Sequence, residues 1–431
     1  MTRHLRIGIA GLGTVGLGVL NILTMHKEIL EARAGCRLTL KAVTARDRHR
    51  DRGVDLNKYT WFDNALDMAA SEDIDIVVEL IGGADGVAKS FAETAIANGK
   101  HLITANKALI AMHGSSLACA AEDVGVTIGY EAAVAGGVPI VKVLREGLAA
   151  NRVDSIYGIL NGTCNYILTA MAQSGRDFHD VLKEAQNLGY AEEDPSFDVD
   201  GIDTAHKLSI LACLAFGVEI DFEGIHIEGI RHISSIDINF ARELGYGIKL
   251  LGVATRSERG IIMRVHPCMV PDDAPINHVN GVLNGIGVAG DCVGATMYEG
   301  PGAGAGPTAS AVVADILDIA RGNNASVFGV SAHKLGPVQT LDVSNCRGPY
   351  YIRLTVVDKP GVFADIAAIL RENQISMETV VQRGRAPGEA VSVVMTLHDS
   401  LEADVALTLE DLAALEAVVE PPRMIRIEVS S

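Results

Sequence analysis

The chain has little positive charge, no closely spaced cysteine pair and no long hydrophobic run. Its 36 basic residues face 54 acidic ones, and the net charge of −18 opposes binding to nucleic acid or to an acidic membrane. The seven cysteines contain no CxxC pair, which indicates reduced thiols in a cytoplasm. The longest strongly apolar run, residues 208–218, is shorter than the roughly 20 residues of a membrane helix. Since an apolar strand already begins at Leu5, we expect no signal peptide, and small molecules are the expected ligands.

A glycine-rich turn near the N-terminus predicts a nucleotide site. Residues 5–10 predict a strand, and the GxGxxG pattern GLGTVG follows it, before an apolar-periodic helix that reaches about residue 30. In the dinucleotide-binding fold, the first glycine allows a tight turn, the second a close approach of the pyrophosphate, and the third close helix–strand packing. A purely structural turn is the alternative. The candidate cofactor-binding residues of this turn are Gly11, Gly13, Thr14, Val15 and Gly16.

Strand and helix patterns alternate after this turn. Such alternation predicts a doubly wound parallel sheet, and we assign residues 1–135 to a Rossmann-type NAD(P)-binding domain in an α/β protein of two or three domains. An apolar helix at about 306–322 should return to this domain and complete it. The further expected strands are 38–44, 74–81, 101–105 and 127–134.

Two charged positions bear on the cofactor. Arg46, after the second strand, suits the 2′-phosphate of NADP, while Asp47 keeps NAD possible and a basic surface loop is the alternative. Lys107 follows the fourth strand at the carboxyl edge of the sheet, where such folds bind ligands. It lines the nicotinamide pocket in one interpretation and is an exposed lysine at a helix start in the other.

An aspartate and a lysine lie one turn apart on an unusually apolar predicted helix, residues 202–216. Lys207 shares a stripe with Ile210 and Leu214 and should be largely removed from water. A buried ammonium needs a partner, which Asp203 supplies four residues earlier. A lysine in such surroundings can exchange a proton with a substrate oxygen near neutral pH. The alternative is an ordinary surface salt bridge, against which the apolar neighbours argue.

Two further segments predict close contacts. Asn161 and Thr163 lie where a predicted strand, 155–160, meets the next helix, and they either cap that helix or hold the carboxylate or amine of a small ligand. Gly302 and Gly304 belong to a series of four alternating glycines ahead of an apolar helix. The backbone must approach something closely there.

Seven motifs, in this order, resemble homoserine dehydrogenase. They are GLGTVG at 11–16, TANKAL at 104–109, EAAVAGGVPI at 131–140, NGTCNYIL at 161–168, GYAEEDP at 189–195, GIDTAHKL at 201–208 and GPGAGAGPTAS at 300–310. The resemblance runs through most of residues 5–320. It implies NAD(P)-dependent interconversion of L-aspartate 4-semialdehyde and L-homoserine, a step toward threonine, methionine and isoleucine.

The resemblance also implies roles for single residues. Lys207 looks like the acid/base that protonates the aldehyde oxygen as hydride arrives, and Asp203 like the residue that orients it and contacts the substrate. Lys107 matches a lysine that lies close to nicotinamide and substrate and shares the proton transfer. Glu192 matches a substrate-binding glutamate that accepts from the amino group. The candidate substrate-binding residues are Glu192, Asp203, Asn161 and Thr163, and Gly302 and Gly304 look like contacts on the nicotinamide side.

A structural monovalent cation, sodium, is implied as well. Its ligands in the family are mainly backbone carbonyls, whose oxygen donors suit a hard cation. The matching residues are Glu131, Val134, Gly136 and Val138. Residues 136–305 would then form an α+β catalytic and dimerisation domain, in a homodimer or a homotetramer.

The C-terminal part has a pattern of its own. After a polar linker at 323–348, strands and helices over 349–431 follow the order βαββαβ, which is ferredoxin-like. DKPGVFADIAAIL resembles the ACT domain, a module that pairs with copies of itself and binds amino acids. Threonine is then the expected allosteric inhibitor, and a passive dimerisation domain is the alternative. The expected elements are 350–357, 362–372, 375–382, 390–397, 401–418 and 424–429.

Two other functions compete with this one. They are a dehydrogenase for another amino-acid aldehyde or imine, and a catalytically inert sensor that binds a nicotinamide and an amino acid. A sensor has no reason to keep Asp203 and Lys207 on a buried stripe, with Glu192 in the acidic loop before it. The sequence therefore favours the homoserine dehydrogenase.

Overall fold

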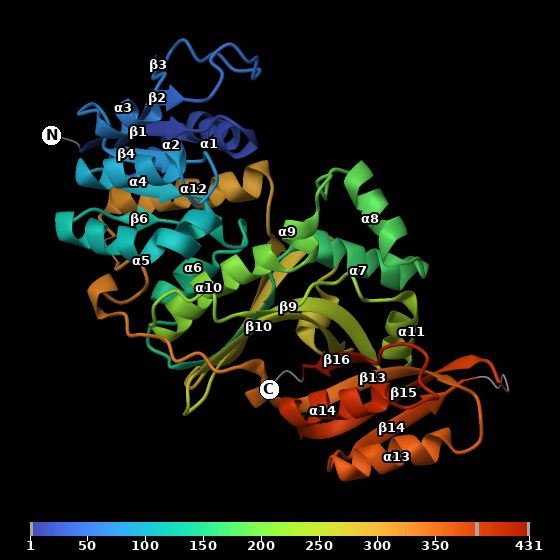
Figure 1. Ribbon diagram of the computed structural model, residues 1–431. Helices are drawn as coiled ribbons and strands as arrows, with labels where there is room; N and C mark the ends of the chain where they lie inside the picture. The colour runs from blue at the N-terminus through green and yellow to red at the C-terminus, as the bar shows by residue number, and fades with distance from the viewer. Residues whose placement is uncertain (1–2, 324, 384–387, 429–431) are drawn as a thin grey trace.

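The computed structural model describes residues 3–323, 325–383 and 388–428. An N-terminal, a central and a C-terminal region follow one another through the molecule, and helix α12 (Ala305–Arg321) returns from the central region to the N-terminal one (Figure 1). Among the described residues, no helix is both long enough and apolar enough to cross a membrane.

Six parallel strands in the order β3-β2-β1-β4-β5-β6 form the sheet of the N-terminal region. This is the strand order of a dinucleotide-binding fold, so the expected Rossmann-type sheet is confirmed. The expected strand at 127–134 is wrong in its length, because the chain turns into a 3₁₀ helix, η1, after two paired residues. The elements are β1 (His4–Ala10), β2 (Arg37–Thr44), β3 (Thr60–Trp61), β4 (Ile76–Glu79), β5 (His101–Thr104), β6 (Ile128–Gly129) and η1 (Glu131–Ala133).

Helices cover both faces of this sheet. Val78 of β4 packs with α1, α2 and α12 on one face, while Val77 packs with α3, α4 and α5 on the other. The helix expected to reach about residue 30 is interrupted at His26, where a second helix begins. The helices are α1 (Thr14–Met25), α2 (Lys27–Ala34), α3 (Ala65–Ala70), α4 (Val87–Ala97) and α5 (Lys107–Val124).

The central region carries five antiparallel strands in the order β12-β11-β7-β9-β10. Helix α10 packs on this sheet and also on α5, so it lies between the two regions. Gly252 in β9 admits α10 closely, since a Cβ there would lie 3.2 Å from the Thr204 methyl group. The elements are α6 (Ile140–Lys142), η2 (Val143–Gly147), β7 (Val153–Ile159), α7 (Gly162–Ser174), α8 (Phe178–Asn187), α9 (Ser196–Val199), α10 (Ile202–Phe216), β8 (His226–Ile227), α11 (Ser235–Glu243), β9 (Tyr246–Arg256), β10 (Ile261–Pro271), η3 (Pro275–His278), β11 (Leu283–Gly290) and β12 (Gly294–Pro301).

The C-terminal region has the strand order β16-β13-β15-β14, which confirms the expected ferredoxin-like arrangement. Its strand β16 also pairs in parallel with β10, with Cys268 opposite Arg426, so the two regions share one 10-stranded sheet. The last expected strand extended to residue 429, which lies outside the described residues. The elements are η4 (Ala332–Lys334), η5 (Val343–Asn345), β13 (Arg347–Val357), α13 (Val362–Glu372), β14 (Met377–Gln382), β15 (Ala390–Leu401), α14 (Glu402–Ala413) and β16 (Arg423–Ile427).

Where it is described, the segment expected as a linker, 323–348, runs first along α5, where the Ser331 hydroxyl donates to the Glu122 carboxylate at 2.7 Å, and then along the central region. The main-chain N–H of Glu219 donates to Gly336 O at 2.9 Å, and that of Ile261 donates to Gln339 O at 2.9 Å. This segment is therefore fastened to the surface that it crosses. The domain boundaries at 135, 305 and 349 stay predictions.

Candidate active site

The start of α10 places a carboxylate in the interior. Gly201 takes a φ of 87° in the turn before the helix, and α10 begins without a side-chain cap. Asp203 therefore lies in the first turn, where the positive end of the helix dipole stabilises its negative charge. The Asp203 side chain is only 4% exposed. Such a carboxylate requires charged or hydrogen-bonding partners.

Two lysines from different regions supply these partners. Oδ1 of Asp203 lies 2.7 Å from Nζ of Lys107, and Oδ2 lies 2.7 Å from Nζ of Lys207. Lys107 begins α5 at the carboxyl edge of the parallel sheet, and Lys207 lies one turn along α10. The predicted contact between Asp203 and Lys207 is confirmed, and the same carboxylate joins the central region to the N-terminal one.

The two lysines set the electrostatics of the cluster. Burial alone would raise the pKa of Asp203, but the charges of Lys207 and Lys107 lower it well below its ordinary value. Burial and the charge of Lys107 also lower the pKa of His206, so its ring is neutral near pH 7. The site therefore holds a permanent carboxylate beside two primary amines.

Lys207 keeps a donor for a ligand. Its ammonium donates to Leu160 O at 2.7 Å and to Asp203 Oδ2 at 2.7 Å, and an ammonium group has three N–H donors. Within the described part of the chain, the third has no acceptor. The Lys207 side chain is 12% exposed and that of Lys107 is 33% exposed, so both amines reach the edge of the buried site.

The structure shows one of the two roles that the sequence left open for Asn161, the helix cap, and the ligand contact stays a prediction. The side-chain oxygen of Asn161 accepts from the main-chain N–H of Cys164 at 2.8 Å and so caps α7. Its side-chain nitrogen donates to Asp203 Oδ2 and to Asp198 Oδ1, both at 2.8 Å. Asn161 therefore helps to orient the Asp203 carboxylate.

The acidic loop between α8 and α9 is more open. The Thr163 hydroxyl donates to Tyr190 O at 2.8 Å and fastens this loop to α7. Glu192 is exposed in the loop, and its main-chain oxygen accepts from the Gln186 side chain at 3.0 Å. Among the described residues the Glu192 carboxylate has no ion-pair partner. The structure therefore does not join Glu192 or Thr163 to the Asp203 cluster, and their substrate roles stay predictions.

An aromatic ring that the sequence analysis missed forms one wall of the site. The Phe197 ring centroid lies 5.4 Å from Nζ of Lys107 and 5.6 Å from the centroid of the His206 ring. Phe197 is 42% exposed, although its neighbours are largely buried. A lone aromatic residue on the one-turn helix α9 carries no sequence signal that would place it beside Lys107.

A buried carboxylate at the end of β4 was also missed. Oε1 of Glu79 accepts from the main-chain N–H of Ile81 at 2.6 Å, and Oε2 accepts from the Thr104 hydroxyl at 2.5 Å. Asn106, which caps α5, donates to Gly83 in the same loop at 2.7 Å. The loop after β4 is thereby fastened to the start of α5. The sequence feature that could have indicated Glu79 is its position as a glutamate at the end of an apolar strand.

A cavity of about 800 Å³ opens at the carboxyl edge of the parallel sheet, beside the glycine-rich turn. Gly11 takes a φ of 102°, and a Cβ there would lie 2.2 Å from Leu80 O. A Cβ on Gly16 would lie 2.0 Å from Gly11 O, whereas the space around Gly13 is open. Helix α1 begins there without a side-chain cap, so its first N–H groups are available. These features fit a dinucleotide pyrophosphate.

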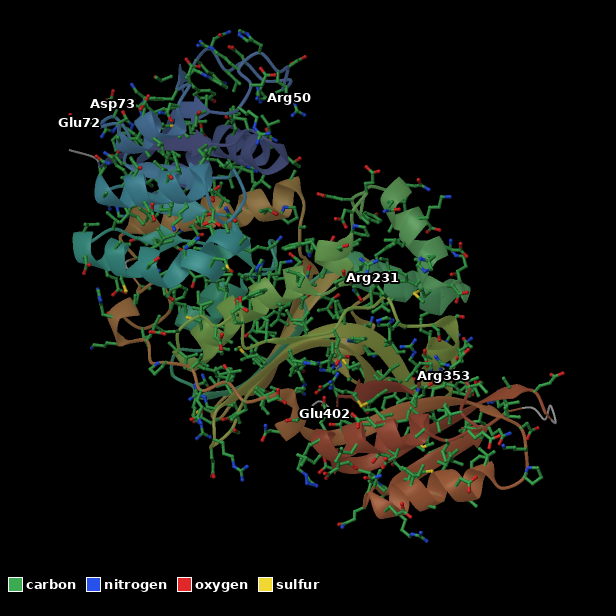
Figure 2. All side chains as sticks on the ribbon, in the orientation of Figure 1. Arg50, Glu72, Asp73, Arg231, Arg353 and Glu402 are labelled. Carbon is green, nitrogen blue, oxygen red and sulfur yellow. The ribbon has the colours of Figure 1, made fainter. Side chains whose placement is uncertain are left out.

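Three arginines line this cavity, of which the sequence analysis named one. Arg46, Arg50 and Arg52 all face it, and Figure 2 marks Arg50 on the loop at this end of the molecule. The Asp47 carboxylate is used in a hydrogen bond within the loop, where it accepts from the main-chain N–H of His49 at 2.8 Å. The main-chain oxygen of Asp47 accepts from Arg52 at 2.5 Å. The wall carries these three arginines against two aspartates, Asp47 and Asp63, so its net charge is positive.

Comparison with known proteins gives the same assignment along the whole chain. Residues 11–131 match the NAD-binding domain model of homoserine dehydrogenase, residues 139–317 the homoserine dehydrogenase model, and residues 350–417 the ACT domain. The homoserine dehydrogenase of Pseudomonas aeruginosa is 44% identical, with 99% of each chain covered, and that of Bacillus subtilis is 39% identical with the same coverage. The crystal structure of a homoserine dehydrogenase from Thiobacillus denitrificans has a TM-score of 0.93 at 43% identity, again with 99% of each chain covered.

The chain belongs to the homoserine dehydrogenase family. It is an NAD(P)-dependent oxidoreductase that acts on a CH–OH group, and its C-terminal region is an ACT domain. A catalytically inert sensor is not favoured.

In this homoserine dehydrogenase, the predicted cation ligands lie on a tight turn. Ala135 takes a φ of 53° and Gly136 a φ of 35°, and an alanine in this region is uncommon. Within the described residues, no donor reaches the buried main-chain oxygens of Val134 and Gly136, whereas that of Val138 accepts from Ile140 at 2.8 Å. Unpaired buried carbonyl oxygens fit a hard cation.

Glu131, the fourth predicted ligand, begins this turn. Its carboxylate accepts from the main-chain N–H groups of Val141 and Lys142, each at 2.9 Å. Burial and the nearby Asp315 raise the pKa of Glu131 to about 7. The turn is therefore held by a glutamate whose side-chain oxygens are already used.

The two predicted nicotinamide-side glycines differ in their surroundings. A Cβ on Gly302 would lie 1.2 Å from Oδ1 of Asn284, so packing within the protein requires glycine there. Gly304 takes a φ of 121° at the uncapped start of α12, and a Cβ there would lie 3.6 Å from the Pro307 ring, in ordinary contact. The ligand role of both glycines stays a prediction.

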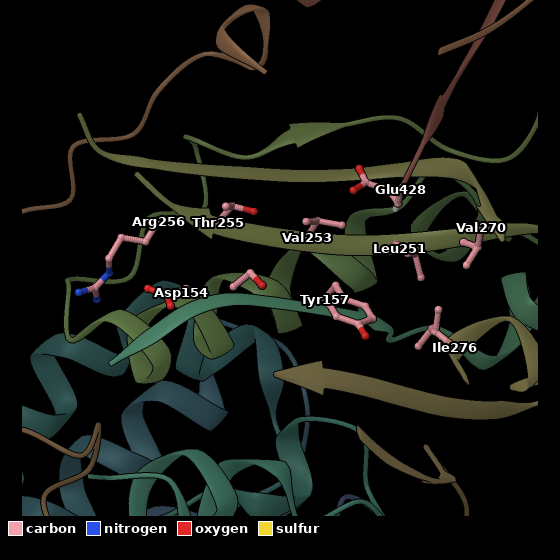
Figure 3. Close-up of a pocket in the computed structure, with 10 residues that line it drawn as sticks. Asp154, Tyr157, Leu251, Val253, Thr255, Arg256, Val270, Ile276 and Glu428 are labelled. Carbon is pink, nitrogen blue, oxygen red and sulfur yellow. The ribbon is translucent and has the colours of Figure 1, made fainter. Parts of the chain in front are cut away.

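A groove of about 270 Å³ lies on the opposite face of the central sheet (Figure 3). Its floor is apolar, with Leu251 and Val253 of β9 and Val270 of β10, and its rim carries Tyr157 and Glu428. Side chains alternate along β9, so the residue before Val253, Gly252, faces α10 instead. The sheet therefore separates this groove from the Asp203 cluster.

Proposed function

We propose that the Asp203 cluster interconverts L-homoserine and L-aspartate 4-semialdehyde, with Lys207 as the acid/base. The observation that carries this proposal is one buried carboxylate shared by two lysines, 2.7 Å from each, beside the carboxyl edge of the nucleotide-binding sheet. Both lysine amines are close enough to serve one substrate oxygen.

In the oxidation of homoserine, the C4 hydroxyl gives its proton to a neutral Lys207 while the C4–H bond breaks and the C=O bond forms. Bound NAD(P) supplies the acceptor for the hydride. Asp203 holds the lysine amine toward the substrate and stabilises the ammonium that results. In the reverse direction the Lys207 ammonium returns the proton to the aldehyde oxygen. Lys107, as the more exposed amine, donates to the same oxygen and shares the proton transfer.

The substrate's amino acid end lies toward the acidic loop in this proposal. Glu192 accepts from its ammonium, and its exposure leaves the carboxylate available for that contact. Asn161 and Thr163 line the entrance of α7 between this loop and Asp203. The substrate ammonium is positively charged and the loop between α8 and α9 is acidic, so electrostatic attraction favours this orientation.

NADP is the preferred cofactor in this proposal. The cavity beside the glycine-rich turn carries Arg46, Arg50 and Arg52, and guanidinium groups suit a 2′-phosphate. NAD would make the same contacts with the glycine-rich turn, but it lacks the 2′-phosphate and so would not make these contacts with the arginines. An archaeal homoserine dehydrogenase that is 26% identical, with a TM-score of 0.63, was solved in complex with NADPH.

A sodium ion held by the turn at 134–138 is also part of this proposal. The unpaired carbonyl oxygens of Val134 and Gly136 support it. We expect sodium chloride to raise the unfolding temperature more than choline chloride at equal ionic strength, because choline is too large for a carbonyl site. Equal effects of the two salts would contradict the site.

Regulation by an amino acid is the proposed role of the ACT domain, with threonine as the inhibitor. The continuous sheet through β10 and β16 supports a mechanical connection between the two regions. A coupling of about 1 to 3 kcal/mol would change the apparent affinity roughly 5- to 150-fold. Activity of the full-length enzyme in millimolar threonine, methionine and isoleucine tests this. If none of them inhibits, the ACT domain is an assembly module.

We also infer a homodimer or homotetramer, in which a second copy covers the groove of Figure 3. The apolar floor of that groove and the exposed strand β12 at the edge of the sheet support this. The molar mass from light scattering checks it. The free cysteines of the described residues support a reducing, cytoplasmic location.

The experiment that tests the reaction follows nicotinamide absorbance with L-homoserine, first with NADP and then with NAD. We expect turnover with both and a higher kcat/KM with NADP. A panel of other amino-acid aldehydes tests the substrate assignment. A better substrate in that panel than L-aspartate 4-semialdehyde would overturn the substrate assignment.

A further inference from the structure

The segment after β8 packs directly on the turn that leads into α10. A Cβ on Gly229 would lie 2.3 Å from Val199 O, and the main-chain N–H of Ile230 donates to the same oxygen at 2.8 Å. A Cβ on Gly201 would lie 3.1 Å from the Ile227 side chain. Because main chain packs on main chain here, no flexible side chain can absorb a shift. A displacement of this segment therefore displaces the start of α10.

A side-chain pair strengthens this connection. Arg231, marked in Figure 2, forms an ion pair with Asp200, with Nη2 3.1 Å from Oδ2, and donates to the Ser196 hydroxyl at 3.0 Å. Ser196 begins α9, and Asp200 lies in the turn between α9 and α10. Asp203 follows that turn directly, so its position depends on the segment 227–231.

Glu228 connects this segment to the C-terminal region. Its main-chain N–H donates to Val265 O in β10 at 2.7 Å, and its Oε1 lies 2.9 Å from Nη2 of Arg426 in β16. Burial alone would raise the pKa of Glu228, but His226 and Arg426 lower it well below its ordinary value. The carboxylate is thus held at the junction by His226 of its own segment, at 2.6 Å, and by an arginine of the ACT domain.

We propose that Glu228 is a positioning residue for Asp203, and that Arg426 holds it there, so that the ACT domain completes the support of the catalytic cluster. This inference rests on the proposed role of Asp203. The path runs from Arg426 to Glu228, along the main chain to Ile230, and across to the turn at 199–201.

The junction has room for the movement that this role requires. A cavity of about 380 Å³ lies between the two regions and is lined by Glu228, Gly229, Asp237 and Arg423. Without Arg426 as a partner, the Glu228 side chain and its main chain can shift into this space. A fully packed junction would hold Glu228 in place without the ion pair.

Substitution of Glu228 tests the proposal without leaving Arg426 unpaired. Arg426 keeps Glu402, whose Oε1 lies 2.5 Å from its Nη2, so the buried guanidinium retains a carboxylate. Glu228→Ala should lower kcat/KM for L-homoserine about ten- to a hundredfold, because Asp203 shifts relative to the two lysines. Glu228→Gln keeps an acceptor and should recover most of the loss. The KM for NADP should not change.

The matched control weakens the same junction at another place. Asp237→Asn removes a charge that pairs with Arg353 at 2.7 Å, on α11 and away from the turn at 199–201. It should lower the unfolding temperature at least as much as Glu228→Ala, with kcat/KM within about twofold of the wild type. If Glu228→Ala does not fold, Glu228→Asp, which is too short to reach Arg426, takes its place.

Two results would overturn the positioning role. One is a wild-type kcat and KM for L-homoserine in Glu228→Ala; the other is an equal loss of activity in Asp237→Asn. A wild-type enzyme that does not oxidise L-homoserine would overturn the proposed function itself, and the inference with it.

Discussion

Two buried carboxylates, Asp203 and Asp237, have similar burial and different partners. Their side chains are 4% and 1% exposed. Asp203 lies between two lysines whose amines reach the edge of the site. Asp237 is held by Arg353, with Nε at 2.7 Å from Oδ1, by the Tyr351 hydroxyl at 3.1 Å, and by the Ser234 hydroxyl at 2.6 Å.

The difference teaches which buried charge marks a catalytic site. The Asp237 cluster uses a planar guanidinium that stays protonated at all accessible pH values, and its partners come entirely from the protein. Figure 2 shows Arg353 at the junction of the central and C-terminal regions. The Asp203 cluster uses two primary amines, and Lys207 keeps a donor for a ligand. Burial is common to both clusters, and the spare donor distinguishes the catalytic candidate.

Removal of Lys207 is the largest expected effect. Lys207→Met should lower kcat about 10²- to 10⁴-fold, because general acid–base catalysis is lost, while the Kd for NADP stays unchanged. The fold should persist, since Lys107 still pairs with Asp203. Stopped-flow absorbance measures kcat, and Lys249→Met, which removes a buried lysine elsewhere, is the control. Near-normal turnover in a folded Lys207→Met enzyme would contradict the assignment.

Removal of the Asp237 charge should affect stability rather than catalysis. Asp237→Asn leaves Arg353 buried without a charged partner, and breaking such a pair costs about 3 to 5 kcal/mol. Chemical denaturation, followed by fluorescence and circular dichroism, measures the free energy of unfolding. A large loss of kcat with unchanged stability would mean that the two clusters do not differ in the way described here.

Substitution of a cation that has no protein partner should affect cofactor binding, rather than catalysis or stability as in the two clusters. Arg46 is exposed in the cofactor cavity, and within the described residues it has no ion-pair partner. Arg46→Ala should raise the KM for NADP about tenfold with little change for NAD, because only NADP carries the 2′-phosphate. Arg48→Ala is the control, since that guanidinium lies over Trp61 at 5.7 Å. Equal changes for both cofactors would place Arg46 away from the ribose.

The smallest effect concerns a buried lysine with neutral partners only. Lys249 donates to Val279 O at 2.7 Å and to the Asn280 side chain at 2.9 Å, and burial lowers its pKa to about 8. The unfolded chain therefore binds more protons than the folded one above that pH, so stability rises with pH. Between pH 8 and pH 9 we expect a gain of about 1 kcal/mol. The Lys249→Met protein should lack this gain. The same slope of the free energy of unfolding against pH in both proteins would contradict the prediction.

The contacts that could be predicted are those between residues close in sequence. The contact of Asp203 with Lys207 follows from helical periodicity, and the glycine-rich turn follows from its own spacing. The contact of Asp203 with Lys107 could not be derived that way, because no local pattern relates the starts of α5 and α10. Glu79 and Phe197 were missed for a related reason: a single side chain in a strand or loop has no periodic pattern.

The sequence by itself determined the class of each region and named Asp203, Lys207 and Lys107 as candidates for the site. Alternating strands and helices specify a parallel sheet, and a buried stripe specifies the face of α10, because both depend on local geometry. Only the tertiary structure decided that β16 pairs with β10 and that Glu228 meets Arg426. Those contacts join segments far apart in the chain, and their energy comes from burial and charge pairing that exist only once the regions have packed together.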